Sequence, residues 1–514
     1  MGFGPRVDYK YNSKGVLPKN KSWFKTNQFS LKVIFHNRMK HYKCLANDSS
    51  LASAVFVPFY AGLDLGRFLW GFNTSVRDAL SENLVNWLKE RPEWRRMWGR
   101  DHFLVGGRVS WDFRRETEKE SEWGSKLMFL PESNNMTMLS IETSLWTNDF
   151  AIPYPTYFHP SNDNEVFAWQ RTMRKRKRPY LFSFVGAPRP DSEESIRGEI
   201  IKQCQSSKKL CKFLDCNDGG TNCDEPANVM KVFERSVFCL QPSGDSYTRR
   251  STFDSILAGC VPVFFNPGSC FKQYLWHFPK NYTKYSVFIP ENEVREKKIS
   301  IGETLLKVPK DEVLAMREEV IRLISSIVYA NPTSSLKTLE DAFDIAVKGV
   351  LERVRKVRKA IEDGKDPGIG FAELNTKRFE MWGPEHGRGG GRSPGVAEGR
   401  RGRGLWGRAR DEERFRRLKR FHSHGGGEIA GPERWVIVIW RINCRSTGGG
   451  WSSYGNLARG GCEGRFLGGL GAEGLTNPEL VGARRSLEAR GGGNGGRSVA
   501  GGEGGFPVEG LGYF

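Results

Sequence analysis

Hydrophobic and polar positions in residues 181–265 follow the periods of short strands and short helices. Three apolar runs have the length and composition of buried parallel strands: Leu181–Val185, Ser236–Leu240 and Val261–Phe265. Between the last two runs, Thr252–Ala258 has helical spacing and is followed by Gly259, a typical helix end. This order of strand, loop, helix and strand predicts an α/β fold with a doubly wound parallel sheet.

The same periods predict elements on both sides of this segment. Ala54–Tyr60 is an apolar run that ends in a glycine-containing turn, as a buried strand does. A helix is expected from Asp191, where Glu194 completes a capping box. Lys310–Ala330 and Leu336–Ile361 carry apolar residues at helical spacing, so we expect two long helices that belong to the core.

Composition divides the chain near residue 382. Residues 383–514 hold 37 of the 59 glycines and have a net charge of +8 (21 basic and 13 acidic side chains), which leaves +12 of the total +20 for residues 1–382. A Gly- and Arg-rich segment of this kind buries too little apolar surface to order itself, so we expect a disordered low-complexity tail. An RNA-binding arm and an inert or artefactual extension are the two interpretations of this tail.

Cysteines and glycosylation sequons in the first 300 residues are typical of the secretory pathway. Four cysteines are closely spaced: Cys204, Cys211, Cys216 and Cys223. Their gaps fit disulfides better than the paired CxxC of a zinc ribbon, which is the alternative. Five Asn-x-Ser/Thr sequons are candidate glycosylation sites: Asn20, Asn47, Asn73, Asn135 and Asn281. No apolar run approaches the roughly 20 residues that cross a bilayer, and the first residues lack a signal peptide, which suggests that an N-terminal piece is missing.

The densest candidate chemistry follows the strand at Ser236–Leu240. A Ser-Gly turn leads to Arg249 and Arg250 beside the start of a helix, and Asp254 lies one helical turn later. Amides and dipole at a helix N-terminus favour an anion, and guanidinium groups add bidentate contacts to phosphate. A capped helix with solvated arginines is the alternative. We interpret the segment as a phosphate or nucleotide site in which Asp254 accepts hydrogen bonds from ribose hydroxyls.

Sequence blocks spread over residues 10–382 resemble those of exostosin-type glycosyltransferases, family 47, and most closely the plant xyloglucan galactosyltransferase branch. The blocks include Val57–Leu65, Gly99–Arg108, Phe184–Arg189 and Gly259–Phe265. They recur in the family's order and at suitable spacing, and none lies in the tail.

The resemblance implies a GT-B fold of two Rossmann-like domains, the first one truncated at its N-terminus, followed by the disordered Gly/Arg-rich tail. The expected divisions are an acceptor-side domain at 1–165, a basic connector at 166–180, a UDP-sugar-binding domain at 181–382 and the tail at 383–514. A nuclear-localisation or phosphate-binding patch is the alternative for the basic run in the connector. The resemblance also implies a type II protein of the Golgi membrane, with the anchor absent from this chain.

The activity that the resemblance implies is inverting transfer of galactose, or a related sugar, from UDP-galactose or a similar UDP-sugar to xylose side chains of xyloglucan. No cofactor, metal or nucleic acid is expected, and other Golgi glycosyltransferases are expected partners. The chain has no Asp-x-Asp motif, which agrees with a metal-free reaction. The expected donor-binding residues are Gly186, Arg189, Ser243, Gly244, Arg249, Arg250 and Asp254. Asp254 matches the family's acidic position, whereas the family's arginine position is Ser251 here and the two arginines stand just upstream of it. We expect Arg250, ahead of Arg249, to meet the diphosphate.

Transfer also needs a general base that takes the proton of the acceptor hydroxyl as UDP leaves. The N-terminal half offers four candidates: Asp64, Asp101, His102 and His159. We prefer His102 and Asp101 as catalytic residues, because they adjoin the Gly106-Gly107 turn, where a strand end is expected.

Family members carry a cytosolic tail, a membrane anchor, a stem and a first strand ahead of the point where this chain starts. Loss of a central strand leaves backbone groups unpaired, so we expect the chain as written to be poorly stable or inactive. The alternatives to an active enzyme are therefore a catalytically inactive fragment and a basic RNA-associated protein that acts through its tail.

Overall fold

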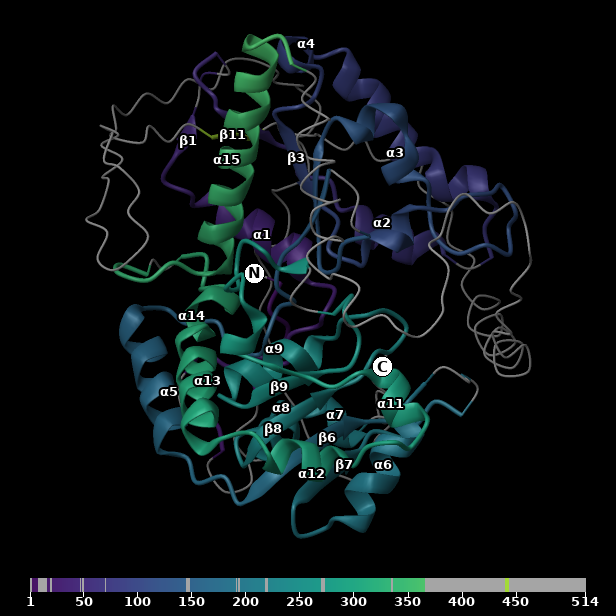
Figure 1. Ribbon diagram of the computed structural model, residues 1–514. Helices are drawn as coiled ribbons and strands as arrows, with labels where there is room; N and C mark the ends of the chain where they lie inside the picture. Colours follow the sequence, from purple (N-terminus) through teal and green to yellow (C-terminus); the bar gives the residue numbers. More distant parts are fainter. Residues whose placement is uncertain are drawn as a thin grey trace, which may run out of the picture. The chain divides into compact units, whose positions relative to one another are not determined.

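In the computed structural model, all described residues lie within Met1–Cys444. The described residues are 2–7, 16–18, 21–46, 48, 50–69, 71–144, 148–190, 192, 195–217, 221–269, 273–333, 336–365 and 440–442. They form two β-sheets, each packed against helices (Figure 1). The predicted α/β class with parallel sheets is confirmed.

The first sheet has the strand order β1-β11-β2-β3-β4-β5. Its strands are β1 Leu45–Ala46, β2 Ala54–Phe56, β3 His102–Val105, β4 Thr137–Ser140, β5 Asp149–Ala151 and β11 Trp440–Ile442. The four strands β2 to β5 are parallel and β11 is antiparallel to both of its neighbours. Every residue of β2, β3 and β4 is buried, and β2, which is Ala-Val-Phe, accordingly has a continuous apolar sequence. The strand expected at Ala54–Tyr60 is thus confirmed, although it ends at Phe56.

Helices of the first half connect these strands. They are α1 Leu31–Lys40, α2 Ala61–Phe68, α3 Thr74–Lys89 and α4 Pro92–Met97, with short 3₁₀ helices η1 Ser110–Phe113, η2 Leu127–Phe129 and η3 Pro131–Asn134. The start of α3 is fixed by Asn73, whose side chain accepts a hydrogen bond from N of Val76. The end of α4 is fixed by Trp98 and Gly99, both at positive φ.

The second sheet has the order β10-β9-β8-β6-β7, and all its strands are parallel. Its strands are β6 Tyr180–Gly186, β7 Cys211–Asp215, β8 Ser236–Gln241, β9 Val261–Phe264 and β10 Val287–Phe288. The three strands predicted from the apolar runs are β6, β8 and β9, so the predicted parallel sheet is confirmed.

The helices that follow in sequence mostly surround the second sheet (Figure 1). They are α5 Asp163–Lys175, α6 Arg197–Ser206, α7 Thr221–Asp224, α8 Pro226–Phe233, α9 Arg250–Leu257, α11 Glu291–Arg295, α12 Ile301–Leu306, α13 Lys310–Arg322, α14 Ile324–Ile327 and α15 Ala342–Glu362, with the 3₁₀ helix η4 Tyr282–Lys284. The short helix predicted after the Ser-Gly turn is α9, and Gly259 at φ +62° follows it as expected.

Three helix bounds differ from those predicted. The helix expected from Asp191 begins six residues later, at Arg197, and Asp191 and Glu194 lie outside the described residues. The helix expected to reach Ala330 is interrupted at Leu323 and stops at Ile327, because N of Ala330 donates to Oδ2 of Asp341 instead of continuing the helix. That same aspartate caps α15, which therefore begins at Ala342.

The last long helix, α15, packs against β2 of the first sheet, beside α1 (Figure 1). Arg38 of α1 forms an ion pair of 3.2 Å with Asp341, and its guanidinium lies 4.9 Å from the ring centroid of Phe343. The first sheet is therefore covered by residues from both ends of the described chain.

Disulfides, as predicted, account for the clustered cysteines. The bonds are Cys204–Cys211, Cys216–Cys223 and Cys239–Cys260. Over the described residues there is no group of His, Cys, Asp and Glu that could hold a metal ion, so the zinc interpretation of these cysteines is wrong. The last of these bonds links β8 to the residue before β9 and reinforces the pairing of the two central strands.

The basic run expected to form a solvated connector has a partly structural role. It covers the end of α5 and the approach to β6, where Arg178 donates to the carbonyl oxygens of Phe233, Ser236 and Ala258 at 2.7–3.0 Å. Arg178 thereby fixes the carboxyl ends of α8 and α9 against the start of β8.

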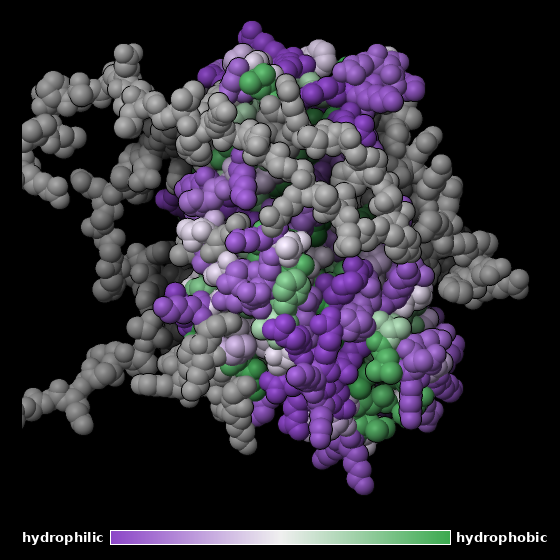
Figure 2. Space-filling view, turned by 90° about the vertical axis from the view of Figure 1, so that its left-hand side faces the viewer, coloured by the Kyte–Doolittle hydropathy of each residue, from purple (hydrophilic) through white to green (hydrophobic). Residues whose placement is uncertain are grey.

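The tail contributes one described element, the strand β11, which lies in a segment expected to lack structure. The other residues of 383–514 lie outside the described residues, so their disorder stays a prediction. No described helix combines the length and the apolarity that a membrane span requires. On the face drawn in Figure 2, hydrophilic residues cover most of the described surface.

Candidate donor site at the carboxyl edge of the second sheet

The loops that follow β6 and β8 meet at the carboxyl edge of the second sheet. β6 ends at Gly186 and its neighbour β8 ends at Gln241, so the two loops start side by side. Arg197 joins them, because its Nε donates to O of Ser243 (3.1 Å) and its Nη1 donates to O of Ala187 (3.4 Å). Ligands of doubly wound sheets bind at an edge of this kind.

Three guanidinium groups gather on these loops. Arg189, after β6, forms an ion pair with Asp245, after β8. Arg249 lies over the backbone of Gly244, where a Cβ atom would overlap its Nη1 and lie 3.1 Å from Nη2 of Arg197. Any side chain at position 244 would displace Arg249, which is a physical reason for the glycine in the Ser-Gly turn.

The positive charge of this arginine cluster is only partly balanced. Arg197 is 4% exposed, and burial together with the charges of Arg249 and Arg189 lowers its pKa to about 8. Burial also lowers the pKa of Arg249. Within the described part of the chain, neither Arg197 nor Arg249 has a carboxylate at ion-pair distance. Glu142 opposes part of the shift at Arg249, and Asp245 pairs with Arg189. Because guanidinium groups that face one another without full compensation are costly, the cluster is complementary to an anion.

Two buried polar atoms at the same edge have no hydrogen-bond partner among the described residues. They are Oγ of Ser243 and Nε2 of Gln241. The other side-chain atom of this glutamine, Oε1, accepts from Oγ of Ser251 at 2.6 Å, which fixes its orientation. The edge therefore combines guanidinium groups with free polar atoms, as a phosphate or sugar ligand requires.

Arg250, the arginine expected to meet the diphosphate first, makes its contacts elsewhere. Its Nη1 donates to O of Thr26, its Nε lies 3.4 Å from Oδ2 of Asp254, and its guanidinium lies 3.8 Å from the ring centroid of Tyr157. Asp254 is 2% exposed, and burial raises its pKa to about 6 although Arg250 opposes the shift. The geometry thus favours Arg249 for the anion and pairs Arg250 with Asp254. Contact of Asp254 with a nucleoside stays a prediction.

A carboxylate from the first sheet holds the donor loop, residues 243–249, from the other side. Glu142, after β4, accepts hydrogen bonds from N of Tyr247 (3.1 Å) and from N and Oγ1 of Thr248 (3.2 and 2.8 Å). It is 3% exposed, and burial raises its pKa although these bonds favour the ionised form. Glu142 therefore fixes the residue that directly precedes Arg249.

The predicted catalytic pair lies away from the donor loop. The strand end expected at the Gly106-Gly107 turn is confirmed, but His102 is the first residue of β3 and lies at its other end. Asp101 and His102 are fully buried, with Oδ1 and Nδ1 2.8 Å apart, and Oδ2 of Asp101 accepts from Arg96 at 2.6 Å. Burial opposes ionisation of Asp101, but the bonds from His102 and Arg96 outweigh it and lower its pKa. Their catalytic role stays a prediction that this placement does not favour.

The other two base candidates differ in accessibility. His159 is fully buried between O of Tyr329 and Oγ1 of Thr26, and burial lowers its pKa to about 3. Asp64 lies in the first turn of α2, after the carboxyl end of β2, and is half-buried. Burial raises the pKa of Asp64 to about 6. Of the four candidates, Asp64 alone is both partly exposed and beyond the carboxyl end of a strand.

The sequence patterns do not indicate two of the side chains that build this edge, Arg197 and Glu142. The helix predicted from Asp191 would contain Arg197 in its interior. In the structure, Arg197 is the first residue of α6 and contacts the loops that follow β6 and β8. The available signal was an arginine at the end of the connection between β6 and the next helix, eleven residues after the end of the strand. Glu142 has no local signal, because its partners lie 105 and 106 residues away in the sequence.

The sequons are only partly described. Asn73, Asn135 and Asn281 lie within the described residues, and Asn20 and Asn47 lie outside them. Asn73 and Asn281 are exposed and use Oδ1 to accept bonds from the serine or threonine of their own sequon. Glycosylation at these positions stays a prediction.

Comparisons with known proteins identify the family of this chain. The model of the Exostosin GT47 domain matches residues 5–305. The probable xyloglucan galactosyltransferase GT12 of Arabidopsis thaliana is 58% identical over 369 residues, which cover 71% of this chain and 72% of the relative. The xyloglucan galactosyltransferase MUR3 of the same plant is 56% identical over 381 residues, which cover 74% of this chain and 61% of MUR3.

Among solved structures, the pneumococcal O-GlcNAc transferase GtfA in complex with UDP and GlcNAc covers 55% of this chain and 60% of its own, at 8% identity and a TM-score of 0.26. A TM-score this low supports no inference. The match to the family model and the identity to the plant relatives assign the family without a structural neighbour. This chain belongs to the exostosin GT47 family.

Proposed function

We propose that this chain is a glycosyltransferase that moves galactose, or a related sugar, from a UDP-sugar to xylose side chains of xyloglucan. The names of its relatives supply the substrates. The single observation that supports a diphosphate donor is the arginine cluster at Gly244, in which two guanidinium groups lack a carboxylate partner among the described residues. A UDP-sugar carries two phosphate groups that would supply the missing negative charge.

In this proposal the two sheets are the two Rossmann-like halves of a GT-B enzyme. The divisions at 165, 180 and 382 stay as proposed, with the donor in the second half and the acceptor in the first. We propose that the enzyme needs no metal, resides in the Golgi membrane as a type II protein and acts beside other Golgi glycosyltransferases. No described contact favours the alternative of an RNA-associated protein.

The reaction would begin with attack of an acceptor hydroxyl on the anomeric carbon. Negative charge then develops on the leaving diphosphate, and Arg249 and Arg197 would stabilise it in a largely dry site, where such interactions are strongest. The acceptor proton needs a base, and Asp64 is the base in this proposal because of its position and exposure. Its raised pKa brings the carboxylate closer to the acidity that proton transfer requires.

The test measures UDP binding and sugar transfer on the full chain. We expect saturable calorimetric binding of UDP that is far tighter than that of uridine, and galactose transfer from UDP-galactose to a xyloglucan oligosaccharide. Arg249→Ala and Gly244→Ala should each weaken UDP binding by about tenfold or more, because one removes a guanidinium and the other displaces it. Asp64→Asn should lower kcat about 100-fold and leave UDP binding unchanged.

A different experimental result would contradict each part of the proposal. A folded chain that binds uridine as well as UDP would remove the diphosphate assignment. UDP binding without transfer from any UDP-sugar to xyloglucan would remove the reaction but keep the donor site. An Asp64→Asn variant with unchanged kcat would show that Asp64 is not the general base.

A further inference from the structure

Two tryptophans lie together on the segment that follows β3. Trp111 is in η1 and Trp123 is in the loop that follows, with their ring centroids 6.1 Å apart and the ring planes 42° apart. Both rings are half-buried. Nε1 of Trp123 donates to Oδ1 of the buried Asp112 at 2.7 Å, and Oδ2 of the same residue accepts from Nε of Arg108 at 2.5 Å. The position of the indole is therefore set by a buried carboxylate.

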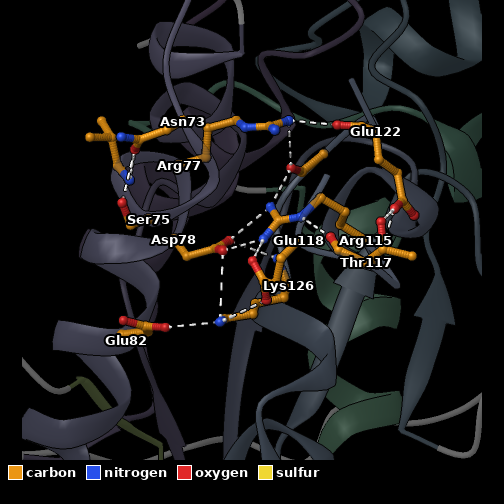
Figure 3. Close-up of polar contacts among 12 residues, drawn as sticks. Asn73, Ser75, Arg77, Asp78, Glu82, Arg115, Thr117, Glu118, Glu122 and Lys126 are labelled. Atoms are coloured by element: carbon orange, nitrogen blue, oxygen red, sulfur yellow. Dashed lines mark hydrogen bonds and ion pairs between the residues drawn. The ribbon is translucent and has the colours of Figure 1, made fainter. Parts of the chain in front are cut away.

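The loop that carries Trp123 is held by two buried arginines, and Figure 3 shows this network. Arg77 of α3 donates to the carbonyl oxygens of Glu120 (3.0 Å), Glu122 (2.7 Å) and Gly124 (3.3 Å). Both arginines are at most 3% exposed. Arg77 and Arg115 together contact six carbonyl and carboxylate groups: the carbonyl oxygens of Thr117, Glu120, Glu122 and Gly124 and the carboxylates of Asp78 and Glu118. These contacts compensate the cost of burying the two guanidinium groups and hold the loop in place.

The second of these arginines, Arg115, connects the same loop to α3. Its guanidinium forms an ion pair with Asp78 (2.5 Å) and donates to O of Gly124 (3.0 Å). Lys126 extends the network toward Glu82 at 3.2 Å, as Figure 3 shows. The loop is therefore fixed at both of its ends before any ligand arrives.

This tryptophan pair lies close to the donor loop. N of Ser110, next to Trp111, donates to O of Glu142 at 3.0 Å, and the carboxylate of Glu142 binds Thr248 of the donor loop. Tyr247, on the same loop, is 53% exposed. The pair is therefore connected to the donor loop through Ser110 and Glu142, at the carboxyl side of both sheets.

We propose that Trp111 and Trp123 form a platform on which the glucan main chain of the acceptor stacks. This inference rests on the proposed function. The face of a pyranose ring presents C–H groups that pack on an aromatic face, while its hydroxyl groups hydrogen-bond at the edges. Neighbouring half-exposed rings suit successive sugars of one chain, and the partly exposed Arg108 provides a polar group beside them. Rings fixed in advance lose little entropy when the ligand binds.

The test compares Trp111→Ala, Trp123→Ala and the double variant with the wild-type chain. The probes are a xyloglucan oligosaccharide without galactose, an unsubstituted β-1,4-linked glucan oligosaccharide and UDP, each titrated by calorimetry. We expect each substitution to weaken oligosaccharide binding about tenfold and to leave the Kd for UDP within twofold. Trp123→Phe, which keeps a ring but loses the bond to Asp112, should lie between wild type and alanine. Trp98→Ala, at a tryptophan that is 58% exposed elsewhere on the surface, is the control and should change neither affinity.

The outcomes separate the platform from the proposed function. Retained UDP binding shows that a variant is folded, so unchanged oligosaccharide affinity in the double variant would overturn the platform alone. A wild-type chain that binds UDP but neither oligosaccharide would also overturn it. A wild-type chain that binds the oligosaccharides through these rings but does not bind UDP would support the platform and overturn the proposed function.

Discussion

Two consecutive arginines, Arg249 and Arg250, differ in what balances their charge. Arg249 has no carboxylate at ion-pair distance among the described residues, whereas Arg250 lies 3.4 Å from Asp254. A buried charge is tolerated when it is paired and becomes costly when its partner is removed. The first arginine therefore suits a ligand that brings a negative charge, and the second suits a permanent internal pair.

Removal of the second arginine should therefore destabilise the fold in a pH-dependent way. Asp254 already has its pKa raised to about 6 by burial, and loss of Arg250 should raise it further. In the unfolded chain this carboxyl ionises near pH 4, so the variant loses stability as pH rises from there through the folded-state pKa. We expect Arg250→Ala to lower the free energy of unfolding by about 3 kcal/mol at pH 8 and by clearly less at pH 5. Urea unfolding of the variant and the wild type at pH 5 and pH 8 measures this difference in free energy.

The matched control is the double variant Arg250→Ala, Asp254→Asn, which contains no buried carboxyl at this position. Its loss of stability relative to wild type should be smaller at pH 8 than that of the single variant, and no larger at pH 8 than at pH 5, because it lacks the carboxyl that destabilises the wild-type fold as pH rises. Equal destabilisation by the single variant at pH 5 and pH 8 would show that Arg250 acts through its contacts with Thr26 and Tyr157 alone.

At the scale of elements, the sequence predicted the buried strands well because burial on both faces produces continuous apolar runs. It predicted less well where elements end and at which end of a strand a given residue lies. His102 adjoins a glycine turn in the sequence, yet a strand of four residues separates them by roughly 13 Å, at the opposite edge of the sheet. Contacts between distant segments, such as that of Glu142 with Thr248, depend on the packing of the two sheets and leave no local pattern.

Glu142, which follows β4, should determine how firmly the donor loop is held in position. Glu142→Ala leaves N of Tyr247 and the two donors of Thr248 without their acceptor, so the loop that positions Arg249 should loosen. We expect weaker UDP binding, by about fivefold to 50-fold, measured by calorimetry. Glu142→Gln keeps one acceptor oxygen and removes a buried charge, so its UDP affinity should lie between those of Glu142→Ala and wild type.

A carboxylate remote from the loop provides the comparison. Glu296 is exposed and pairs with Lys298, so Glu296→Ala should leave UDP affinity unchanged. If Glu142→Ala bound UDP as tightly as wild type while remaining folded, the position of Arg249 would not depend on the first sheet.

At the scale of the whole molecule, the first sheet is completed by segments far from it in sequence. Helix α15 packs on β2, and β11 pairs antiparallel with the edge of β2 through Trp440, Arg441 and Ile442. An uncovered strand edge exposes backbone donors and acceptors and promotes association between molecules. The Gly- and Arg-rich composition of 383–514 predicts no such strand, although the apolar and β-branched run Trp435–Ile442 within it is a local signal for one.

The strand β11 should therefore contribute to stability although it is short. Deletion of residues 383–514 removes the pairing of β11 with both of its neighbours, β2 and β1, and at about 1 kcal/mol for each backbone hydrogen bond we expect the free energy of unfolding to fall by about 3 kcal/mol or more. Light scattering should show more association, because the edge of β2 becomes free. Arg441→Pro in the full chain tests the pairing alone, since proline removes one backbone donor and keeps the rest of the tail. Equal stability of the deletion variant and the full chain would mean that β11 contributes nothing to the fold. Equal loss in both variants would assign the whole effect of the tail to this strand.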